Sequence, residues 1–386
     1  MWADLVGQEP IVAVLSMAVD TASAALAGDP SVTGMSHAWL FTGPPGSGRS
    51  NAARAYAAAL ECERGGCGEC SECRTTLAGS HPDVTLVRTE QLSIKVDEVR
   101  ELVRKAAMSP TGRRWQVLVV EDADRLTEQA ADALLKSVEE PAARTIWLLC
   151  APTIEDVVPT IRSRCRMLSL RTPPPGAVAA VLTERDGVPE DVATFAARAS
   201  QGHIGRARAL AADEATRSRR RDVLALPSRL HDIGACVMAA AQLIEAADEE
   251  AAAIADRLDP AERAGLEQAL GVGTRGVRVR GAAASLKELA DQHKTRRKRF
   301  QRDALDRSLT DLMSFYRDVL MLQTGSGVVL VNEEVRRDVE AMAHRESAEN
   351  TLRRIEAILE CREALEGNVA PLLAVESLML DLARPE

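Results

Sequence analysis

A glycine-rich segment at residues 43–50 constrains this chain more than any other feature of its sequence. It follows a short apolar run at 38–41 and precedes an alanine-rich run at 52–60. A strand, a glycine loop and a helix in that order are typical of a phosphate-binding loop, because the loop N–H groups and the positive N-terminus of the helix face a single anion. The sequence therefore predicts a nucleotide-binding domain. The predicted loop residues are Gly43, Pro44, Gly46, Ser47, Gly48, Arg49 and Ser50.

One position of this loop departs from the usual motif. The motif places a lysine before the Ser or Thr that binds Mg²⁺, and this chain has Arg49 before Ser50. A guanidinium is a planar fork on a longer stem than an ammonium, so Arg49 does not reproduce a point charge between the β- and γ-phosphates. ATP or ADP with Mg²⁺ is the expected ligand class, with weakened hydrolysis. The alternative is a Gly/Pro loop that binds nothing.

Length, composition and charge narrow the class of protein. The chain has 386 residues, enough for two or three domains, and its aromatic content of only 3% beside abundant Ala and Leu predicts mostly helix. The net charge of −9 argues against nonspecific wrapping of nucleic acid. The first ten residues show no secretory signal, and we expect no apolar run of about 18 residues that could span a membrane. We therefore expect a cytoplasmic protein without membrane contact.

Apolar runs alternate with amphipathic segments in the first part of the chain. Further buried strands are predicted at 81–87, 115–120 and 145–150, and helices at 94–103 and 128–140. Buried strands that alternate with helices indicate a parallel sheet covered on both faces.

Three consecutive prolines mark the end of this pattern. Pro173, Pro174 and Pro175 cannot continue a strand or a helix. Only helical patterns follow residue 223, interrupted by a Gly/Arg-rich loop at 271–281. The predicted fold class is therefore α/β plus all-α. The predicted domains are 1–168, of the nucleotide-binding type; 169–222, small and helical; and 223–386, larger and helical.

Four cysteines lie within twelve residues, just after the predicted loop helix. Cys62, Cys67, Cys70 and Cys73 alternate with glycines that permit tight turns. Four thiolates at this spacing suit a tetrahedral Zn²⁺, and a complete set of protein ligands indicates a structural site, because catalytic zinc keeps an open position. The alternative is a group of unmetallated thiols. The other four cysteines are isolated and are expected to be inert packing residues: Cys150, Cys165, Cys236 and Cys361.

Acidic residues follow the predicted strand at 115–120, where P-loop ATPases bind Mg²⁺ and polarise the attacking water. The usual order there is Asp and then Glu, whereas this chain has Glu121 and then Asp122. The longer Glu121 would crowd the ion, and the shorter Asp122 would fall short of the water. Asp122 joins the candidate nucleotide site. The alternative is that these acids cap the helix that begins near Thr127.

Two groups of basic residues have a structural and a functional interpretation. Arg162, Arg164 and Arg166 would usually form a salt-bridged surface, but could present a guanidinium to the nucleotide of a neighbouring subunit, as an arginine finger does. The run at 293–299 could contact a phosphate backbone, although a solvated helix face is the commoner fate of such a run.

The order of these motifs resembles the clamp-loader ATPases of bacterial DNA polymerase III. The resemblance covers roughly residues 1–210 and depends on five motifs. These are Val6-Gly7-Gln8, the loop at 43–50, the four cysteines after it, the segment at 133–141 and Ser163-Arg164-Cys165. It implies an AAA+ P-loop domain with a parallel sheet, a small helical lid domain and a helical C-terminal collar domain for oligomerisation, and it implies loading of a sliding clamp onto primed DNA.

Within that family the departures favour the delta-prime type over the ATP-hydrolysing gamma/tau type. Besides Arg49 and the inverted acids, Pro152 stands where a polar side chain is expected, and Gly205 aligns with a nucleotide-sensing arginine. The Ser-Arg-Cys motif is intact, so the resemblance gives Arg164 the role of a finger in trans. A length of 386 residues suits delta-prime better than tau. The implied partners are gamma/tau and delta subunits, and through the complex the clamp and primed DNA.

Three other functions remain open on the sequence. One is a catalytic clamp-loader ATPase of the gamma/tau type. Another is a self-sufficient AAA+ ATPase in which Arg49 supports catalysis and Asp122 is essential. The third is a zinc-dependent nucleic-acid-binding module that uses the phosphate loop only as a scaffold.

Overall fold

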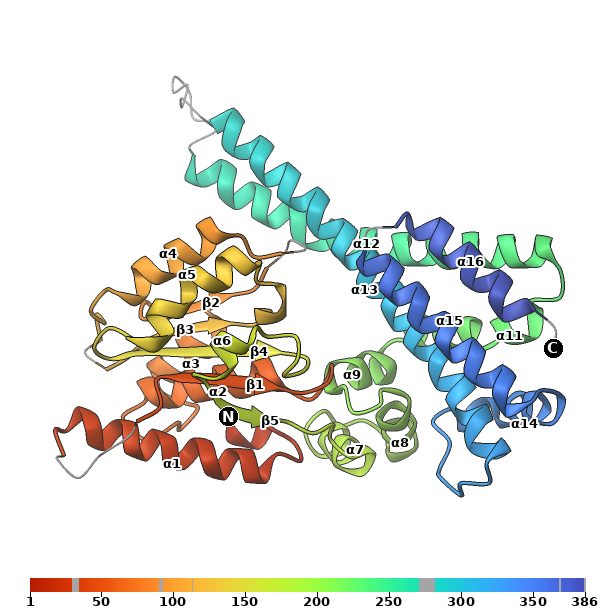
Figure 1. Ribbon diagram of the computed structural model, residues 1–386, viewed down its shortest axis with the longest axis horizontal. Coiled ribbons are helices and arrows are strands. Elements are labelled where there is room, and N and C mark those ends of the chain that lie inside the picture. The colour runs from red at the N-terminus through yellow and green to blue at the C-terminus, as the bar shows by residue number, and fades with distance from the viewer. Residues whose placement is uncertain (30–34, 90–92, 113, 271–281, 368, 385–386) are drawn as a thin grey trace. The chain divides into compact units, whose positions relative to one another are not determined.

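The computed structural model describes residues 1–29, 35–89, 93–112, 114–270, 282–367 and 369–384. The predicted loop at 271–281 lies outside them. The chain separates into two compact units, Met1–Ala211 and Ala212–Glu386. Each unit is described here by itself (Figure 1).

A parallel sheet forms the centre of the first unit. Its strand order in the described residues is β2-β3-β4-β1-β5, and every neighbouring pair is parallel. The predicted parallel sheet is therefore confirmed. Strand β5 was not predicted, because only one of its four residues is buried and it lacks an apolar run. The strands are β1 (Ala38–Thr42), β2 (Val84–Val87), β3 (Gln116–Val120), β4 (Thr145–Ala151) and β5 (Arg166–Ser169).

Helices cover both faces of this sheet. Successive residues of a strand point to opposite faces, so Trp39 packs with α1 and α2 on one face, whereas Leu40 packs with α4 and α5 on the other. The first-unit helices, including the 3₁₀ turns η1 and η2, are η1 (Trp2–Asp4), α1 (Glu9–Leu26), α2 (Arg49–Glu61), α3 (Ser71–Ala78), α4 (Val96–Ala106), η2 (Ala123–Arg125), α5 (Glu128–Glu139), α6 (Pro159–Arg162), α7 (Pro175–Glu184), α8 (Glu190–Ala199) and α9 (Ile204–Ala212).

Helix α1 corrects one expectation from the sequence. It is long and apolar enough to cross a membrane by length and composition alone, and it is the one such helix among the described residues. Its small apolar residues raise the mean hydropathy although the helix carries Glu9 and Asp20. Leu15 and Val19 are buried in the cluster that contains Trp39 of the sheet. A core helix of a globular domain passes the same test, so this feature is weak evidence for a membrane span.

Helices α7, α8 and α9 enclose a small core of their own, centred on Val178, Leu182 and Ala196. This core lies within the first unit, whereas α10 belongs to the second. The three-part domain division from the sequence stays a prediction.

The second unit is helical throughout its described residues. Helices α12 and α13 form a long antiparallel hairpin, with 37 and 42 residues. Its distal part has little buried surface: none of the described α12 side chains is buried beyond Ala255, and none of the described α13 side chains before Ala304. Figure 1 shows this part extending beyond the other helices of the unit. The elements are α10 (Glu214–Leu224), α11 (Leu226–Arg229), α12 (Ile233–Ala269), α13 (Ala282–Gln323), the 3₁₀ turn η3 (Glu333–Val335), α14 (Arg336–Arg345), α15 (Ala348–Glu366) and α16 (Pro371–Ala383).

Ion pairs across the hairpin engage part of the basic run at 293–299. Arg296 pairs with both Asp259 and Glu262, at 2.6 and 2.8 Å. His293 lies against the same two carboxylates. These carboxylates and His293 form a group that could hold a metal ion, but the Arg296 guanidinium already supplies them with a cation. A salt-bridged helix face therefore accounts for this part of the run, and a phosphate contact stays untested.

Arg220 of α10 lies at the centre of a buried polar network. Its guanidinium donates to Asp311 at 3.2 Å and to the side chains of Asn332 and Glu334. Asn332 in turn donates to Asp318 at 2.9 Å. Residues 216–221 belong to α10, and Arg220 is 3% exposed.

We expect Arg220→Met to destabilise the second unit by about 3–5 kcal/mol, because it leaves buried carboxylates without their cation. The neighbouring Arg219 makes only longer pairs at the surface, so the control Arg219→Met should cost less than about 1 kcal/mol. Urea denaturation of the full chain measures both free energies. Equal effects of the two substitutions would show that the network does not stabilise the unit.

Candidate functional site: a phosphate loop, an exposed arginine and a cysteine cluster

The segment between β1 and α2 forms a tight glycine loop. Gly46 and Gly48 have φ of +85° and +87°, in the left-handed region that side chains disfavour. The Gly43 N–H donates to the Pro152 carbonyl at 3.0 Å, and the Ser47 N–H donates to the Pro44 carbonyl at 3.0 Å. The predicted strand, loop and helix therefore occur in the predicted order, and the loop lies at the carboxyl ends of β1 and β4.

Arg49 bonds to its own loop. Its Nη1 donates to the Gly43 carbonyl at 2.7 Å. Its Nε is buried without a hydrogen-bond partner in the described part of the chain, and so is the Ser47 hydroxyl. Buried polar atoms without partners are uncommon in folded proteins and mark places where a ligand can complete the bonding. The loop thus keeps features of an anion site, although its cation is partly engaged with the protein.

The two acids after β3 have different environments. Glu121 is buried and pairs with Arg54 of α2 at 2.6 Å. Asp122 has one carboxylate oxygen that is buried and unpartnered among the described residues. Asp122 is therefore the acid still available to a ligand. Arg54 was missed by the sequence analysis; its only signal was a single cation in an alanine-rich run, one turn after Ser50.

Cys150 at the end of β4 links these groups. Its thiol donates to the Arg49 carbonyl at 3.9 Å. Burial raises the pKa of the Cys150 thiol, with Glu121 and Asp122 adding to the shift and Arg49 opposing it. Loop, acids and thiol therefore lie close enough to interact electrostatically. Because the thiol stays protonated, Cys150 contributes packing rather than a nucleophile.

Two residues from distant segments hold the loop in place. The Gln8 amide donates to the Ser47 carbonyl at 3.3 Å, and the Arg171 N–H donates to the Gln8 side-chain oxygen at 3.3 Å. His203, in the turn between α8 and α9, lies so close that a Cβ on Gly46 would be 2.7 Å from its Cα. Gln8 entered the sequence analysis only through the resemblance, and His203 was given no role there.

Pro152 follows β4, at the position where a polar side chain was expected. Pro152 supplies only its carbonyl to the loop, as described above. The Thr153 hydroxyl donates to Asp156 at 2.8 Å. Thr153 is thus engaged within its own turn.

Arg164 lies on the surface after α6. Its side chain is 39% exposed, and its Nε pairs with Glu139 at the end of α5. Nη1 donates to the Thr160 carbonyl at 2.8 Å and to the Ser163 hydroxyl at 3.1 Å. The neighbouring Cys165 thiol is inert, because burial raises its pKa to about 12.

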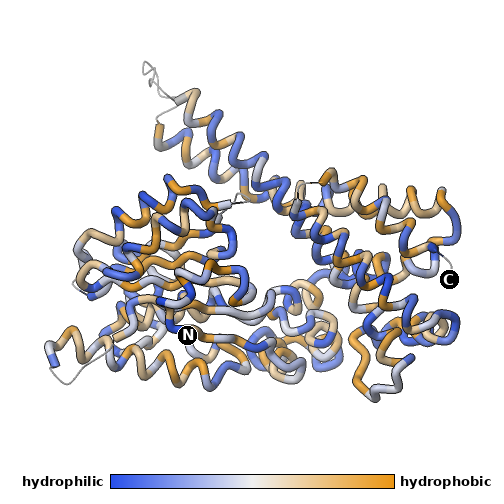
Figure 2. The backbone as a smooth tube through the Cα atoms, in the orientation of Figure 1, coloured by the Kyte–Doolittle hydropathy of each residue, from blue (hydrophilic) through white to orange (hydrophobic). Residues whose placement is uncertain are grey.

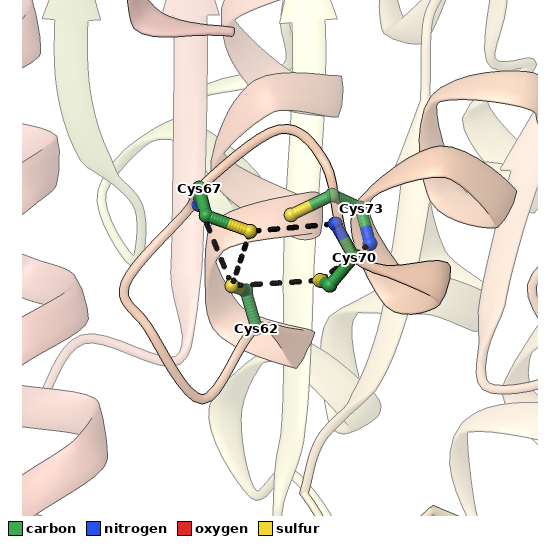
Figure 3. A group of neighbouring side chains, drawn as sticks. All are labelled: Cys62, Cys67, Cys70 and Cys73. Carbon is green, nitrogen blue, oxygen red and sulfur yellow. Dashed lines mark hydrogen bonds between the residues drawn. The ribbon is translucent and has the colours of Figure 1, made fainter.

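The four clustered cysteines converge between α2 and α3 (Figure 3). Their sulfur atoms all lie within 4.8 Å of one another, and the Cys62 sulfur is 3.7 Å from those of Cys67 and Cys70. Four sulfurs bound tetrahedrally at about 2.3 Å from one Zn²⁺ would be about 3.8 Å apart. The cluster therefore has the dimensions of a tetrahedral metal site that is closed by protein ligands.

Backbone N–H groups point at these sulfurs. The Cys67 and Arg64 N–H groups donate to the Cys62 sulfur at 3.5 and 3.4 Å, and the Cys70 N–H donates to the Cys67 sulfur at 3.4 Å. Hydrogen bonds from the backbone of Glu69 and Cys70 lower the pKa of the Cys67 thiol to about 6. Such bonds favour thiolates, the form in which cysteine binds metals.

Two family models match parts of this chain. A family model described as "DNA polymerase III, delta subunit" matches residues 20–174, and one described as "DNA polymerase III, delta subunit, C terminal" matches residues 298–384. The first match contains the loop, the acids, the cysteines and Arg164. Much of the α12–α13 hairpin lies between the two matches.

The curated relatives include proteins named DNA polymerase III subunit gamma/tau and proteins named DNA polymerase III subunit delta'. DNA polymerase III subunit gamma/tau of Mycobacterium tuberculosis is 34% identical over 202 residues, which are 50% of this chain and 33% of that protein. DNA polymerase III subunit delta' of Pseudomonas aeruginosa is 37% identical over 163 residues, 41% of this chain and 49% of that protein. Subunit delta' of Escherichia coli is 35% identical over 180 residues, 45% of this chain and 54% of that protein. The chain thus spans between a third and about half of these relatives.

Among solved structures, a gamma subunit-related protein of DNA polymerase III from Thermotoga maritima aligns with 95% of this chain and 98% of its own, with a TM-score of 0.43 and 15% identity.

Substitutions at two glycines of the loop test its contact with the turn before α9. Gly48→Ala should cost about 1–2 kcal/mol from its left-handed backbone alone, because nothing lies within 4 Å of the added Cβ. Gly46→Ala should cost about 1–3 kcal/mol more, because its Cβ would overlap the His203 backbone. Denaturant unfolding of both variants gives the difference. Equal losses of stability would show that the loop does not pack against His203.

Proposed function

The chain belongs to the DNA polymerase III clamp-loader family of delta, delta-prime and gamma/tau subunits, and from this premise we propose that it is a delta-prime-type subunit. In this proposal it supports ATP-dependent loading of a sliding clamp onto primed DNA. It has weak or no ATPase activity of its own, and it supplies Arg164 to the nucleotide of a neighbouring subunit.

The exposed position of Arg164 is the observation that supports the proposal most. A finger must reach a nucleotide outside its own domain, and the side chain is at the surface of the first unit. Arg49, by contrast, is bonded to the Gly43 carbonyl inside its own loop. This difference in exposure favours Arg164 as the cation that stabilises charge in a second subunit.

The chain's own loop has the parts of a nucleotide site with altered chemistry. The N–H groups of the loop at 43–50 would hold phosphates, and Ser50 and Asp122 would hold Mg²⁺, which supplies charge neutralisation when bound. Glu121, at the usual metal position, already pairs with Arg54. Competition from Arg54 for this carboxylate favours weak hydrolysis.

The unpartnered atoms of Ser47, Arg49 and Asp122 favour a second candidate function. They would be satisfied by a bound nucleotide. In that case the chain would be a self-sufficient AAA+ ATPase or a gamma/tau-type subunit, with Asp122 essential for turnover.

Zinc is the metal that the cysteine cluster fits. Cys62, Cys67, Cys70 and Cys73 supply the four sulfur ligands of a structural site, and their spacing matches the tetrahedron. The site would fix the connection between α2 and α3 and so the C-terminal end of the helix that begins at the phosphate loop.

The second unit supplies the proposed collar, through which the chain would meet gamma/tau and delta subunits in the cytoplasm. Figure 2 shows hydrophobic residues along α16 and the first part of α12. Several of them are exposed, which is typical of a surface that binds another protein. They include Ile233, Val237, Met238, Leu373 and Leu380.

Arg164→Ala should leave the chain folded and assembled but lower ATP turnover by the complex at least about 100-fold, since arginine fingers contribute about 10³–10⁵ in rate. The readout is steady-state phosphate release by the complex with gamma/tau-type and delta-type subunits. Arg162→Ala, in the same segment, is the matched control and should leave the rate unchanged. Normal turnover by the Arg164→Ala complex would refute the finger assignment.

Turnover by the purified chain alone separates the two candidate functions. We expect no phosphate release above background, because Arg49 and Glu121 are engaged within the protein. Brisk turnover that Asp122→Asn abolishes would establish the self-sufficient ATPase instead.

Metal content tests the zinc site. The purified chain should contain about one Zn²⁺, and Cys70→Ser should lose it and lower the unfolding temperature of the first unit. Cys361→Ser, in the second unit, is the control and should keep the metal. The measurements are elemental analysis and calorimetry. A metal-free chain of unchanged stability after zinc exposure would contradict the assignment.

A further inference from the structure

Glu139 is the one charged partner of Arg164 among the described residues. It is the last residue of α5, and Pro141 stands just beyond it. A proline has no N–H to extend the helix, so the helix ends here and the position of Glu139 is set by the backbone. The Glu139 carboxylate forms an ion pair with Arg164 Nε, and both side chains are at the surface, with 42% and 39% exposed.

The contacts of Arg164 leave one nitrogen of its guanidinium, Nη2, without a partner in the described part of the chain. The group has five N–H donors: one on Nε and two on each Nη atom. Nε forms an ion pair with Glu139, and Nη1 donates to the Thr160 carbonyl and the Ser163 hydroxyl. Nη2 has no partner in the described part of the chain. Both of its N–H groups are therefore available to an anion from outside.

We propose that Glu139 is a positioning residue, which holds Arg164 so that Nη2 faces the phosphates of the neighbouring subunit's nucleotide. The inference rests on the proposed function and adds a second residue to it. A free arginine side chain samples many rotamers and loses that freedom when it binds. Contacts that fix the rotamer beforehand reduce this loss, and the charge then meets the transition state without rearrangement.

This role differs from that of an ordinary surface ion pair. An exposed pair contributes little to folding stability, so removing Glu139 should leave the fold intact. Its effect should appear only where Arg164 acts, as a lower turnover number at unchanged affinity for ATP, because Glu139 does not itself touch the nucleotide.

The experiment measures kcat and KM for ATP in the assembled complex. Glu139→Ala should lower kcat about three- to tenfold, the range expected when one long side chain must be ordered anew, with KM unchanged. Glu139→Asp, which keeps the carboxylate on a shorter stem, should recover part of the loss. Glu140→Ala is the matched control, because Glu140 is the adjacent exposed carboxylate and the described contacts of Arg164 do not include it.

A double substitution completes the test. In the Arg164→Ala background, Glu139→Ala should cause no further loss, because its effect runs through Arg164. A normal kcat for Glu139→Ala, or an equal loss in both backgrounds, would overturn the positioning role even if Arg164→Ala is inactive. If Arg164→Ala itself turns over normally, the proposed function fails, and this inference fails with it.

Discussion

The burial of helix α2 is the constraint from which the rest of the first unit follows. A parallel sheet must be covered on both faces, and α2 lies against it with almost every residue from Ala52 to Glu61 buried. A polar side chain on such a helix must find its partner inside the unit. Arg54 therefore meets Glu121, and Arg49 at the first turn meets its own loop. The same helix ends at the first residue of the cysteine cluster, so one buried helix joins both candidate sites.

The sequence revealed the parts of the fold that depend on local pattern. Continuous apolar runs predicted β1, β3 and β4, because a strand buried on both faces needs no alternation. Strand β5 was not predicted. Backbone hydrogen bonds pair it with β1, and it lacks the apolar side chains that a sequence pattern would reveal. Helix α3 was not predicted either, since its eight residues begin just after Cys70 and the cysteine spacing hid the helical pattern.

The site was predicted to a similar extent. Motif spacing proposed the loop, Asp122 and the cysteines as candidates, and the family resemblance proposed Arg164, because each of these lies within a short stretch of chain. The partners of these residues could not be predicted in the same way. Glu121 is 67 residues from Arg54, and His203 meets Gly46 only after α7, α8 and α9 fold. Contacts between such distant residues are set by topology, which no local pattern records.

The α12–α13 hairpin has a mechanical consequence. Its two helices would be about 55 and 63 Å long at 1.5 Å per residue, and none of the described side chains of its distal part is buried. Pro260 interrupts the backbone bonding of α12 there, which makes this point the softest along the hairpin. Asp259 and Glu262 stand on either side of it, and both are tied to Arg296. Ion pairs thus connect the two helices on both sides of Pro260. The stiffness of the hairpin should therefore depend on the salt concentration around it.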